Sequence, residues 1–538
     1  MKYFIITILS FCIFFSCSEE DEMNSNIKLQ FSSDTITFDT VFATVGSITK
    51  TLTIYNNNSF DVSSNIKLKG LSSANFRMNI DGIPGNTQNN ILIPKNDSIF
   101  IFIEVTINPS SNSTPYILSD SLIFESGNTT QSVMLVAWGQ DAIFHTPNTF
   151  GEIIDGLDTT KIYYHQIASN QTWTNNKPHV IYGYVIVEPN AELNIDAGTN
   201  IYFHQNSGIL VGNPFSNQAG GTLKVNGTYG NEVTFQGDRL DSWYTNLPGQ
   251  WDRIRFIPGS VDNEINYAII KNGTTGIHAD TVANNNPTVK INNTIISNMS
   301  SIGILGQGAV IEANNTIVSE CGQYTVACYI GGDYSFSHCT FANYWNYSIR
   351  NTPSILLNNY YVDAYDNVQI RDLNNVSFEN CIIYGSLSTE ISFQEDESGN
   401  FNYNFDHSLI KIDPNFNTSI SSFNNIIKNT DPLFVDHLNN DFKLSSLSPA
   451  INAGNYQLTF SKSGYHSKTV IADVYTNTST VENVMLAPIN FVGINEIKES
   501  NKVISSYDVL GRKSINHNGL VLKLYENGSV KKTINLNK

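Results

Sequence analysis

The sequence predicts an all-β protein whose largest part is a parallel β-helix flanked by smaller β-modules. Three observations support this fold class. A short phrase recurs every twenty-odd residues, apolar and polar residues alternate near the N-terminus, and asparagine occurs 70 times in 538 residues. Asparagine tolerates left-handed backbone and hydrogen-bonds its own chain, so a fold made of stacked tight turns would favour it.

The recurring phrase is seven residues long and predicts the solenoid. Its third position is always small, and the copies lie 26, 22, 23, 42 and 27 residues apart. The residues at this position are Ala268, Thr294, Thr316, Cys339, Cys381 and Ser408. This period is that of a solenoid coil, and the leucine spacing and helical segments of leucine-rich repeats are missing. We therefore predict a parallel β-helix over residues 144–455, with these small side chains stacked inside it.

The gap of 42 residues leaves two interpretations open. It fits two coils, or one coil that carries an inserted loop such as Tyr360–Asp372.

The N-terminal part, residues 27–143, alternates with period two in runs such as Lys50–Tyr55 and Ser98–Val105. Asn, Ser and Gly clusters separate these runs, a pattern typical of short strands in a β-sandwich. The segment resembles the immunoglobulin-like modules of bacterial surface proteins, which implies a rigid spacer more often than a binding module.

The predicted β-helix resembles the right-handed parallel β-helix proteins of the pectate-lyase-like superfamily. The repeated phrase carries this resemblance, together with Asp431–Asp436 and Ser448–Gly454, which are similar to the closing coil of many extracellular β-helix proteins. Enzymes of this superfamily act on uronate chains. The resemblance therefore implies acidic residues that hold Ca²⁺ against a substrate carboxylate, and a basic residue that removes a proton.

Two smaller β-modules are expected at the C-terminus. Residues 456–490 resemble half of a carboxypeptidase-regulatory-type β-sandwich. Residues 491–538 resemble a type IX secretion sorting domain through Tyr507–Arg512 and Asn527–Lys532. An ordinary terminal β-module is the alternative for this last segment.

The N-terminus predicts export and lipid anchoring. Residues 1–16 hold one Lys and then an apolar run too short for a membrane anchor, as in a signal peptide. Cys17 follows, and an acidic run comes directly after it. We predict that residues 17–26 form an acidic tether. The segment resembles a bacterial lipoprotein signal with Cys17 as the lipidated residue, which implies an outer-membrane protein exposed at the cell surface. An ordinary secretory peptide with an incidental cysteine is the alternative.

The formal net charge of −18 argues against a nucleic-acid partner, because an acidic protein repels phosphate backbones. The spacing of Cys321, Cys328, Cys339 and Cys381 suggests neither a disulfide framework nor a zinc site.

Charged residues are densest between positions 238 and 271. If Ile254 points inward, its strand neighbours point outward. For a lyase, the candidate bases are Arg253, Arg255 and Lys271, and the candidate metal ligands are Asp238, Asp241 and Asp252. Trp243, Tyr244 and Trp251 are candidates for stacking on sugar rings. The alternative is a solvated outer face with salt bridges and an aromatic lid. His278, beside Asp280, is expected to be a hydrogen-bonding residue rather than a catalyst.

Two functions follow. The first is a lipid-anchored surface protein whose β-helix binds glycans without catalysis, using exposed aromatic rings such as Trp173 and Trp345 in addition to those of the charged segment. The second is a polysaccharide lyase or hydrolase acting on uronate-containing glycans. Neither needs an organic cofactor, and Ca²⁺ is the metal that the acidic residues would hold.

Overall fold

A computed structural model describes residues 27–42, 46–70, 75–107, 116–155, 158–260, 262–280, 287–451, 453–460, 468–473, 503–508, 519–525 and 530–535. Within these ranges the elements are strands and the short 3₁₀ helices η3 (Ser242–Tyr244) and η4 (His437–Asn439). The chain divides into two compact units, residues 1–143 with 239–245, and residues 144–238 with 246–538. The predicted signal peptide, Cys17 and the acidic tether lie outside the described residues.

The first unit contains two five-stranded sheets around one apolar core. One sheet has the order β1 (Gln30–Phe31), β3 (Lys50–Asn56), β8 (Asp97–Val105), β5 (Phe76–Ile80) and β6 (Ile83–Pro84). The other has the order β2 (Thr35–Phe42), β10 (Thr129–Gln140), β9 (Tyr116–Ser126), β4 (Val62–Leu68) and β7 (Thr87–Ile93). Alternate residues such as Leu52 and Ile54 are buried, as period two requires. The immunoglobulin-like topology stays a prediction.

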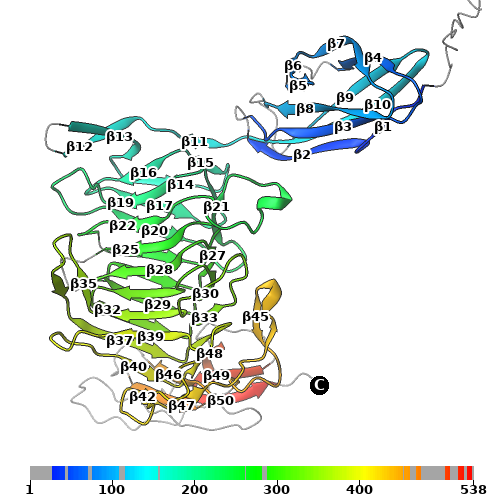
Figure 1. Cartoon of the computed structure of the whole chain (residues 1–538). Coiled ribbons are helices and arrows are strands. Elements are labelled where there is room, and N and C mark those ends of the chain that lie inside the picture. Colours follow the sequence, from blue (N-terminus) through cyan, green and yellow to red (C-terminus); the bar gives the residue numbers. More distant parts are fainter. Residues whose placement is uncertain are drawn as a thin grey trace, which may run out of the picture. The chain divides into compact units, whose positions relative to one another are not determined.

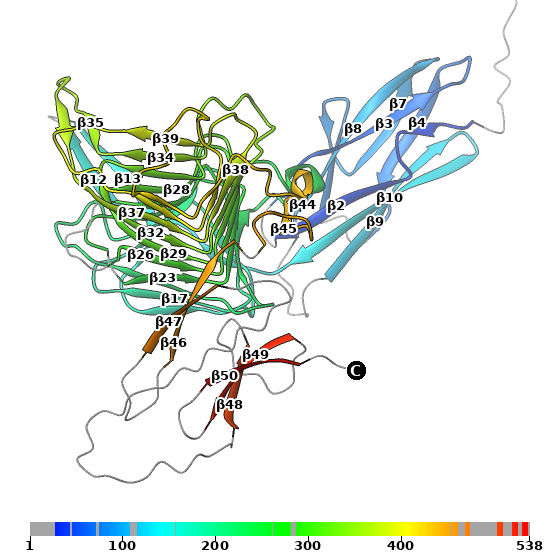
Figure 2. The same cartoon turned by 90° about the horizontal axis from the view of Figure 1, so that it is seen from below.

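The second unit is built from three long sheets, here called sheets I, II and III, whose strands are stacked in chain order (Figures 1 and 2). Sheet I consists of β11 (Ile143–His145), β15 (His179–Ile181), β18 (Asn200–Phe203), β21 (Val233–Gly237), β24 (Ala268–Lys271), β27 (Ile295–Met299), β30 (Ile317–Cys321), β33 (Thr340–Asn343), β38 (Ile382–Gly385), β41 (Leu409–Ile410) and β43 (Ile427–Lys428). Sheet II consists of β12 (Thr149–Asp155), β13 (Asp158–Ile167), β16 (Tyr184–Val187), β19 (Gly208–Val211), β22 (Ile254–Phe256), β25 (Thr275–Ala279), β28 (Ile302–Gln307), β31 (Val326–Tyr329), β34 (Ile355–Asn358) and β39 (Ile391–Gln394). Sheet III consists of β14 (Gln171–Trp173), β17 (Glu192–Asp196), β20 (Thr222–Asn226), β23 (Asn263–Asn266), β26 (Val289–Asn292), β29 (Val310–Asn314), β32 (Gly332–Ser337), β37 (Leu373–Glu379), β40 (Asn404–Asp406) and β42 (Phe423–Asn424).

Each complete coil contributes one strand to sheet II, then to sheet III, then to sheet I, and successive coils pair in parallel. This confirms the parallel β-helix; its right-handed sense stays a prediction. The 42-residue gap is a single coil, because β33 pairs directly with β38. The inserted residues include the hairpin of β35 (Tyr360–Val362) and β36 (Val368–Ile370), so the second interpretation of the gap is the right one.

The predicted ladder of small side chains is confirmed at the corner between sheets III and I. Ala268, Thr294, Thr316, Cys339, Cys381 and Ser408 are each 1% exposed. The residue before each one has positive φ, between 47° and 56°. The carbonyl two positions back accepts a backbone hydrogen bond from the preceding coil, as the Asn292 carbonyl does from the Tyr267 N–H at 3.0 Å. A short hydroxyl or thiol at the small position donates a second hydrogen bond to it. Thr294 Oγ1 donates to the Asn292 carbonyl at 2.9 Å, and Cys339 Sγ donates to the Ser337 carbonyl at 3.2 Å.

Large aromatic rings fill part of the interior beside sheet III. Phe336, Phe378, Phe405 and Phe423 stack along sheet III with centroid distances of 4.9, 4.9 and 5.2 Å. These distances match the spacing of about 4.8 Å between neighbouring strands, so each coil places its ring on the ring of the coil before it.

The segment that was expected to form the closing coil does not form one. Its strands β44 (Phe434–Asp436) and β45 (Asp441–Leu444) pair only with each other within the described residues. The segment packs on the outside of the helix instead, where the ring centres of Tyr344 and His437 lie 4.2 Å apart. The expectation was wrong because the apolar residues of this segment cover the outer face of sheet I rather than the open end of the helix.

Further along the chain, β46 (Asn455–Phe460) pairs with β47 (Lys468–Asp473), and β48 (Val503–Asp508), β49 (Gly519–Tyr525) and β50 (Val530–Asn535) form a small sheet.

A buried histidine pair lies in the first coil. His145 Nε2 and His179 Nδ1 are 2.9 Å apart, and both rings stack on Trp173. Only one of the two nitrogens needs a proton for this hydrogen bond, so a second proton would make two donors face each other. Burial, followed by the charges of His179 and His165, lowers the pKa of His145 to about 3.

The first prediction concerns Thr316. Thr316→Val removes the buried hydroxyl that donates to the Asn314 carbonyl at 3.1 Å, and should lower the free energy of unfolding by about 1–2 kcal/mol. Thr340→Val, at an outward-facing position of β33, is the matched control and should change it by less than about 0.5 kcal/mol. Urea unfolding measures both, and equal effects would contradict the ladder's role.

The second prediction concerns pH. Because the folded pKa of His145 lies below its unfolded value of 6.5, its contribution to stability is complete above pH 6.5 and is lost as the pH falls toward 3. At pH 5 the loss should be about 2 kcal/mol. Urea unfolding at pH 7 and pH 5 should show a smaller drop for His145→Asn than for the wild type, whereas Thr340→Val, which changes no titratable group, should leave the drop unchanged. Identical drops in all three proteins would be evidence against the buried pair.

Candidate functional site

A charged network lies on the outer face of sheet II. Ile254 and Phe256 are fully buried, so Arg253 and Arg255 point outward as the strand pattern predicted. Arg255 pairs with His278 of the next coil. The network therefore runs from coil to coil along one face of the sheet.

The first half of the network centres on Asp252. Its Oδ2 accepts a hydrogen bond from the Tyr184 hydroxyl at 2.7 Å, and its Oδ1 accepts one from Arg253 Nε at 2.9 Å. Burial and then the Asp252 hydrogen bond raise the pKa of Tyr184, so this hydroxyl stays protonated and donates. Arg253 Nη1 lies 3.2 Å from His278 Nδ1.

The second half centres on Asp280. Arg255 Nε and Nη2 donate to its Oδ2 at 3.0 and 2.9 Å, and His278 Nε2 lies 3.0 Å from its Oδ1. Burial opposes the charge of Asp280, but the His278 hydrogen bond and the charge of Arg255 outweigh it, so the pKa of this carboxyl is lowered. A guanidinium can only donate, so His278 Nδ1 accepts from Arg253 and Nε2 carries the proton. The histidine thus links the two ion pairs, and its Nε2 also lies 2.7 Å from Gln307 Oε1.

Tyr184 reaches Asp252 across an intervening coil because that coil has a glycine in its path. Tyr184 pairs with Gly208, and a Cβ at Gly208 would lie 3.1 Å from the tyrosine ring and 2.6 Å from the Arg253 carbonyl oxygen. Any other residue would push the ring or the next coil away. Glycine at position 208 therefore permits the Tyr184–Asp252 contact.

A cavity of about 320 Å³ opens beside this half of the network. Its walls are formed by Tyr184, Asn206, Gly249, Trp251, Asp252, Arg253 and Thr274. Hydroxyl, amide, carboxylate and guanidinium groups meet there, and the one ion pair is internally neutral. Such a cavity offers many donors and acceptors without net charge.

The candidate metal ligands are each engaged by another group. Asp238 Oδ2 lies 2.8 Å from His204 Nδ1, and Asp241 Oδ2 lies 3.6 Å from Arg239 Nε. Asp252 accepts hydrogen bonds from Tyr184 and Arg253, as described above. Asp241 belongs to residues 239–245 of the first unit, whereas the other two belong to the second unit. Among the described residues no group of three or more His, Cys, Asp or Glu side chains is arranged to hold a metal ion.

The aromatic candidates differ in exposure. Trp243 is 77% exposed, and the Arg239 guanidinium lies 3.7 Å from the ring centre of Tyr244. The expectation that Trp251 stacks on a sugar was wrong, because its indole is 1% exposed and stacks on Phe203 at 4.2 Å. Its Nε1 donates to the Lys271 carbonyl. Trp173 and Trp345 are also buried, so they offer no free ring face.

The candidate bases lie on different sheets. Arg253 and Arg255 are ion-paired on the face of sheet II, whereas Lys271 ends β24 in sheet I. Burial lowers the pKa of Lys271. A guanidinium keeps its proton in proteins, so Lys271 is the candidate with the chemistry of a base.

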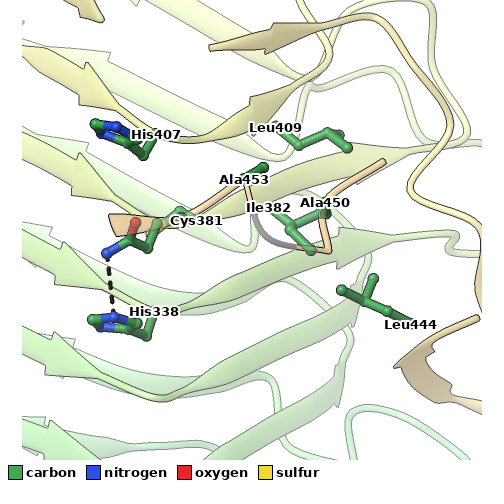
Figure 3. A pocket seen from close by; sticks show the side chains of 10 residues that line it. His338, Cys381, Ile382, His407, Leu409, Leu444, Ala450 and Ala453 are labelled. Atoms are coloured by element: carbon green, nitrogen blue, oxygen red, sulfur yellow. Dashed lines mark hydrogen bonds between the residues drawn. The ribbon is translucent and has the colours of Figure 1, made fainter. Parts of the chain in front are cut away.

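A second cavity, of about 170 Å³, lies between the corner of sheets III and I and the segment that follows β45 (Figure 3). His338 and His407 point the same way, and Asn380, between them in the corner ladder, donates to His338 Nε2 at 3.2 Å. Asn425 donates to His407 Nε2 at 3.0 Å. Both imidazoles thus accept hydrogen bonds from asparagine side chains at the same corner of a neighbouring coil. We therefore assign this cavity a structural role.

Tyr184, Asn206 and Thr274 were not predicted as site residues. Tyr184 lies some seventy positions before Asp252 in the sequence, and no local motif links them. The sequence feature that could have indicated Tyr184 is Gly208. This glycine begins a strand of sheet II at a position where the neighbouring strands carry side chains.

No protein-family model matches this sequence, and neither does any curated protein. Among solved structures, the catalytic domain of a GH87 alpha-1,3-glucanase in complex with nigerose is 10% identical, with a TM-score of 0.23 over 76% of this chain and 91% of that one. A family 123 glycoside hydrolase from Clostridium perfringens is 12% identical, with a TM-score of 0.17 over 22% of this chain and 30% of that one. The CooA pilin subunit from enterotoxigenic Escherichia coli is 13% identical, with a TM-score of 0.17 over 21% and 97%. These TM-scores are too low to assign a family or a function.

In the described part of the chain, no helix has the length and apolar character needed to cross a membrane.

The third prediction tests the network. Asp280→Asn leaves Arg255 without its ion-pair partner and should lower the free energy of unfolding by about 1.5–3 kcal/mol. Glu312→Gln breaks a pair with Lys290 at 3.3 Å whose side chains are half exposed, and should cost less than about 0.5 kcal/mol. Thermal and urea unfolding compare the two, and a cost for Asp280→Asn no larger than that of the control would show that the network is a solvated surface feature.

Proposed function

We propose that this protein binds glycans at the cavity beside Asp252 and Arg253 without cleaving them. The observation that carries the proposal is the neutral, hydrogen-bonded network on the outer face of sheet II. A sugar presents many hydroxyl groups that both donate and accept, and the Asp252 carboxylate, the Arg253 guanidinium, the Asn206 amide and the Thr274 hydroxyl complement them.

The ion pairing of the network also favours binding over catalysis. The Asp252 and Asp280 carboxylates both accept hydrogen bonds from guanidinium groups, so neither is available as a base. Cavities that bind small ligands commonly have volumes of about 300–1,000 Å³, and the cavity here is at the lower end of that range.

The proposal includes a cellular setting. We propose that the chain is a lipoprotein anchored through Cys17 and displayed on the outer membrane, with the N-terminal two-sheet unit as a spacer. The apolar run of residues 1–16 and the acidic residues after Cys17 support this proposal.

The alternative function is a polysaccharide lyase acting on uronate chains. The lowered pKa of Lys271 favours it, because a lysine that loses its proton readily can serve as a base.

The fourth prediction separates the two functions. On a glycan array the wild type should bind, and calorimetry with the best ligand should show about tenfold weaker binding for Arg253→Ala, which removes one charged hydrogen-bonding group. Tyr184→Phe should weaken binding by a smaller factor, and Lys290→Ala, on sheet III, should leave it unchanged.

A turnover assay completes this test. Polyuronate with and without Ca²⁺ should give no unsaturated product absorbing in the ultraviolet. Product that disappears in Lys271→Ala or Arg253→Ala would instead support the lyase. Unchanged binding in Arg253→Ala would contradict the proposed site.

A further inference from the structure

A column of alternating charges runs along the outer face of sheet III. Its residues, here called the charge column, belong to four successive coils and pair in register; they are Lys224, Glu264, Lys290 and Glu312. The residues before and after each of them in its strand are buried, so all four side chains point outward. The column therefore presents one charge per coil, and the sign changes from each coil to the next.

The charge column is accessible to solvent. The side chains of Glu264, Lys290 and Glu312 are between 44% and 50% exposed, and that of Lys224 is 21% exposed. Lys224 Nζ lies 2.9 Å from Glu264 Oε1, and Lys290 Nζ lies 3.3 Å from Glu312 Oε2. Exposed ion pairs of this kind stabilise a chain by at most about 1 kcal/mol each. Since these charges remain partly hydrated, each of them can still meet an opposite charge on a second surface.

The order of the signs is self-complementary. From the first coil to the last it is positive, negative, positive, negative, and in the reverse direction it is negative, positive, negative, positive. Two copies that face each other with their coils in opposite order place Lys224 opposite Glu312 and Glu264 opposite Lys290, each pair twice. Such reciprocal contacts are those of a twofold interface. With the coils in the same order, every charge would instead face its own like, which disfavours that arrangement.

The neighbouring column of side chains is compatible with the same arrangement. Two residues after each charge comes an asparagine that also pairs in register; these are Asn226, Asn266, Asn292 and Asn314. An amide both donates and accepts hydrogen bonds, so asparagine can face asparagine in either direction. The charge column ends at the uncharged residues Asn194 and Ser335 in the flanking coils. These two residues would face each other without adding a like-charged contact.

We propose that the outer face of sheet III binds the same face of a second copy of this chain, with the coils of the two copies in opposite order. Strand spacings of about 4.8 Å and a rise of about 3.3 Å per residue give the six coils from β17 to β32 a face of roughly 400–500 Å². Interfaces of this size are weak and transient, so the expected dimer depends on its charge pattern. The inference is independent of the proposed glycan binding, which concerns sheet II.

Sedimentation velocity of the full chain at increasing protein concentration tests this proposal. In about 0.15 M salt the screening length is about 8 Å, so the distributed net charge of −18 acts less than charges in contact. The wild type should dimerise. Lys224→Glu with Lys290→Glu makes the column wholly negative, and Glu264→Lys with Glu312→Lys makes it wholly positive. Each double variant should dimerise at least about tenfold more weakly, and an equimolar mixture of the two should dimerise again.

The two double variants separate this proposal from an effect of net charge. One is four charges more negative than the wild type and the other is four charges less negative, so net charge would shift their association in opposite directions. The quadruple variant that combines all four substitutions keeps the net charge and restores the alternation of signs. It should dimerise as tightly as the wild type, which also shows that the substituted chains fold.

A further variant tests one like-charged contact at the edge of this face. Glu192 and Asp333, two residues before Asn194 and Ser335, would face each other when the coils run in opposite order. Glu192→Lys should therefore tighten the dimer. An unchanged or weaker dimer in Glu192→Lys would contradict the proposed alignment of coils.

Cross-linking tests the order of the coils directly. It uses a chain with Cys12→Ser and Cys17→Ser, in which the remaining cysteines are buried. A short bismaleimide should join Asn226→Cys to Asn314→Cys when the two variants are mixed. It should give at least about tenfold less product with Asn226→Cys alone, because position 226 of one copy does not face position 226 of the other.

Each outcome decides the proposal. A wild type that stays monomeric at every concentration, or a double variant that dimerises as tightly as the wild type, would overturn it. A mixture of the two double variants that stays monomeric would do the same. Preferential cross-linking of Asn226→Cys to itself would show that the coils of the two copies run in the same order, which the proposal excludes.

Discussion

The β-helix depends on one local interaction, the hydrogen bond from a small buried side chain to the carbonyl two residues before it at the corner of sheets III and I. A left-handed residue turns the chain at the corner, and the hydroxyl or thiol that follows donates a second hydrogen bond to a carbonyl that already accepts one from the preceding coil. Because the corner repeats in every copy of the phrase, strands of consecutive coils start in register. The interior stacks, including the four phenylalanines of sheet III, follow from that register.

The sequence predicted the parts of the fold that are local and periodic. The ladder from Ala268 to Ser408 could be found because each copy carries its own small residue, and the outward direction of Arg253 and Arg255 followed from a buried Ile254. The closing phrase was placed wrongly, because its apolar residues fit an end cap as well as a cover on the outside of a sheet. Sequence alone does not state which apolar surface such a segment meets.

The candidate site was harder to predict because its contacts run between coils. The charged segment was identified, yet Tyr184 reaches it from two coils away, and the irregular coil lengths hide that register in the sequence. Trp251 lies among charged residues and so suggested exposure, whereas its ring enters the core beside Phe203.

The bond between Tyr184 and Asp252 also affects how the solenoid comes apart. Most contacts in a repeat protein join nearest neighbours, so its ends can fray one unit at a time. Here the Tyr184 side chain of β16 extends over Gly208 and donates a hydrogen bond to Asp252 in the turn before β22. This bond links three successive coils. Unfolding from the N-terminal end must therefore break this hydrogen bond before the first of those coils, which carries Tyr184, can separate, so this part of the solenoid should open as one cooperative block.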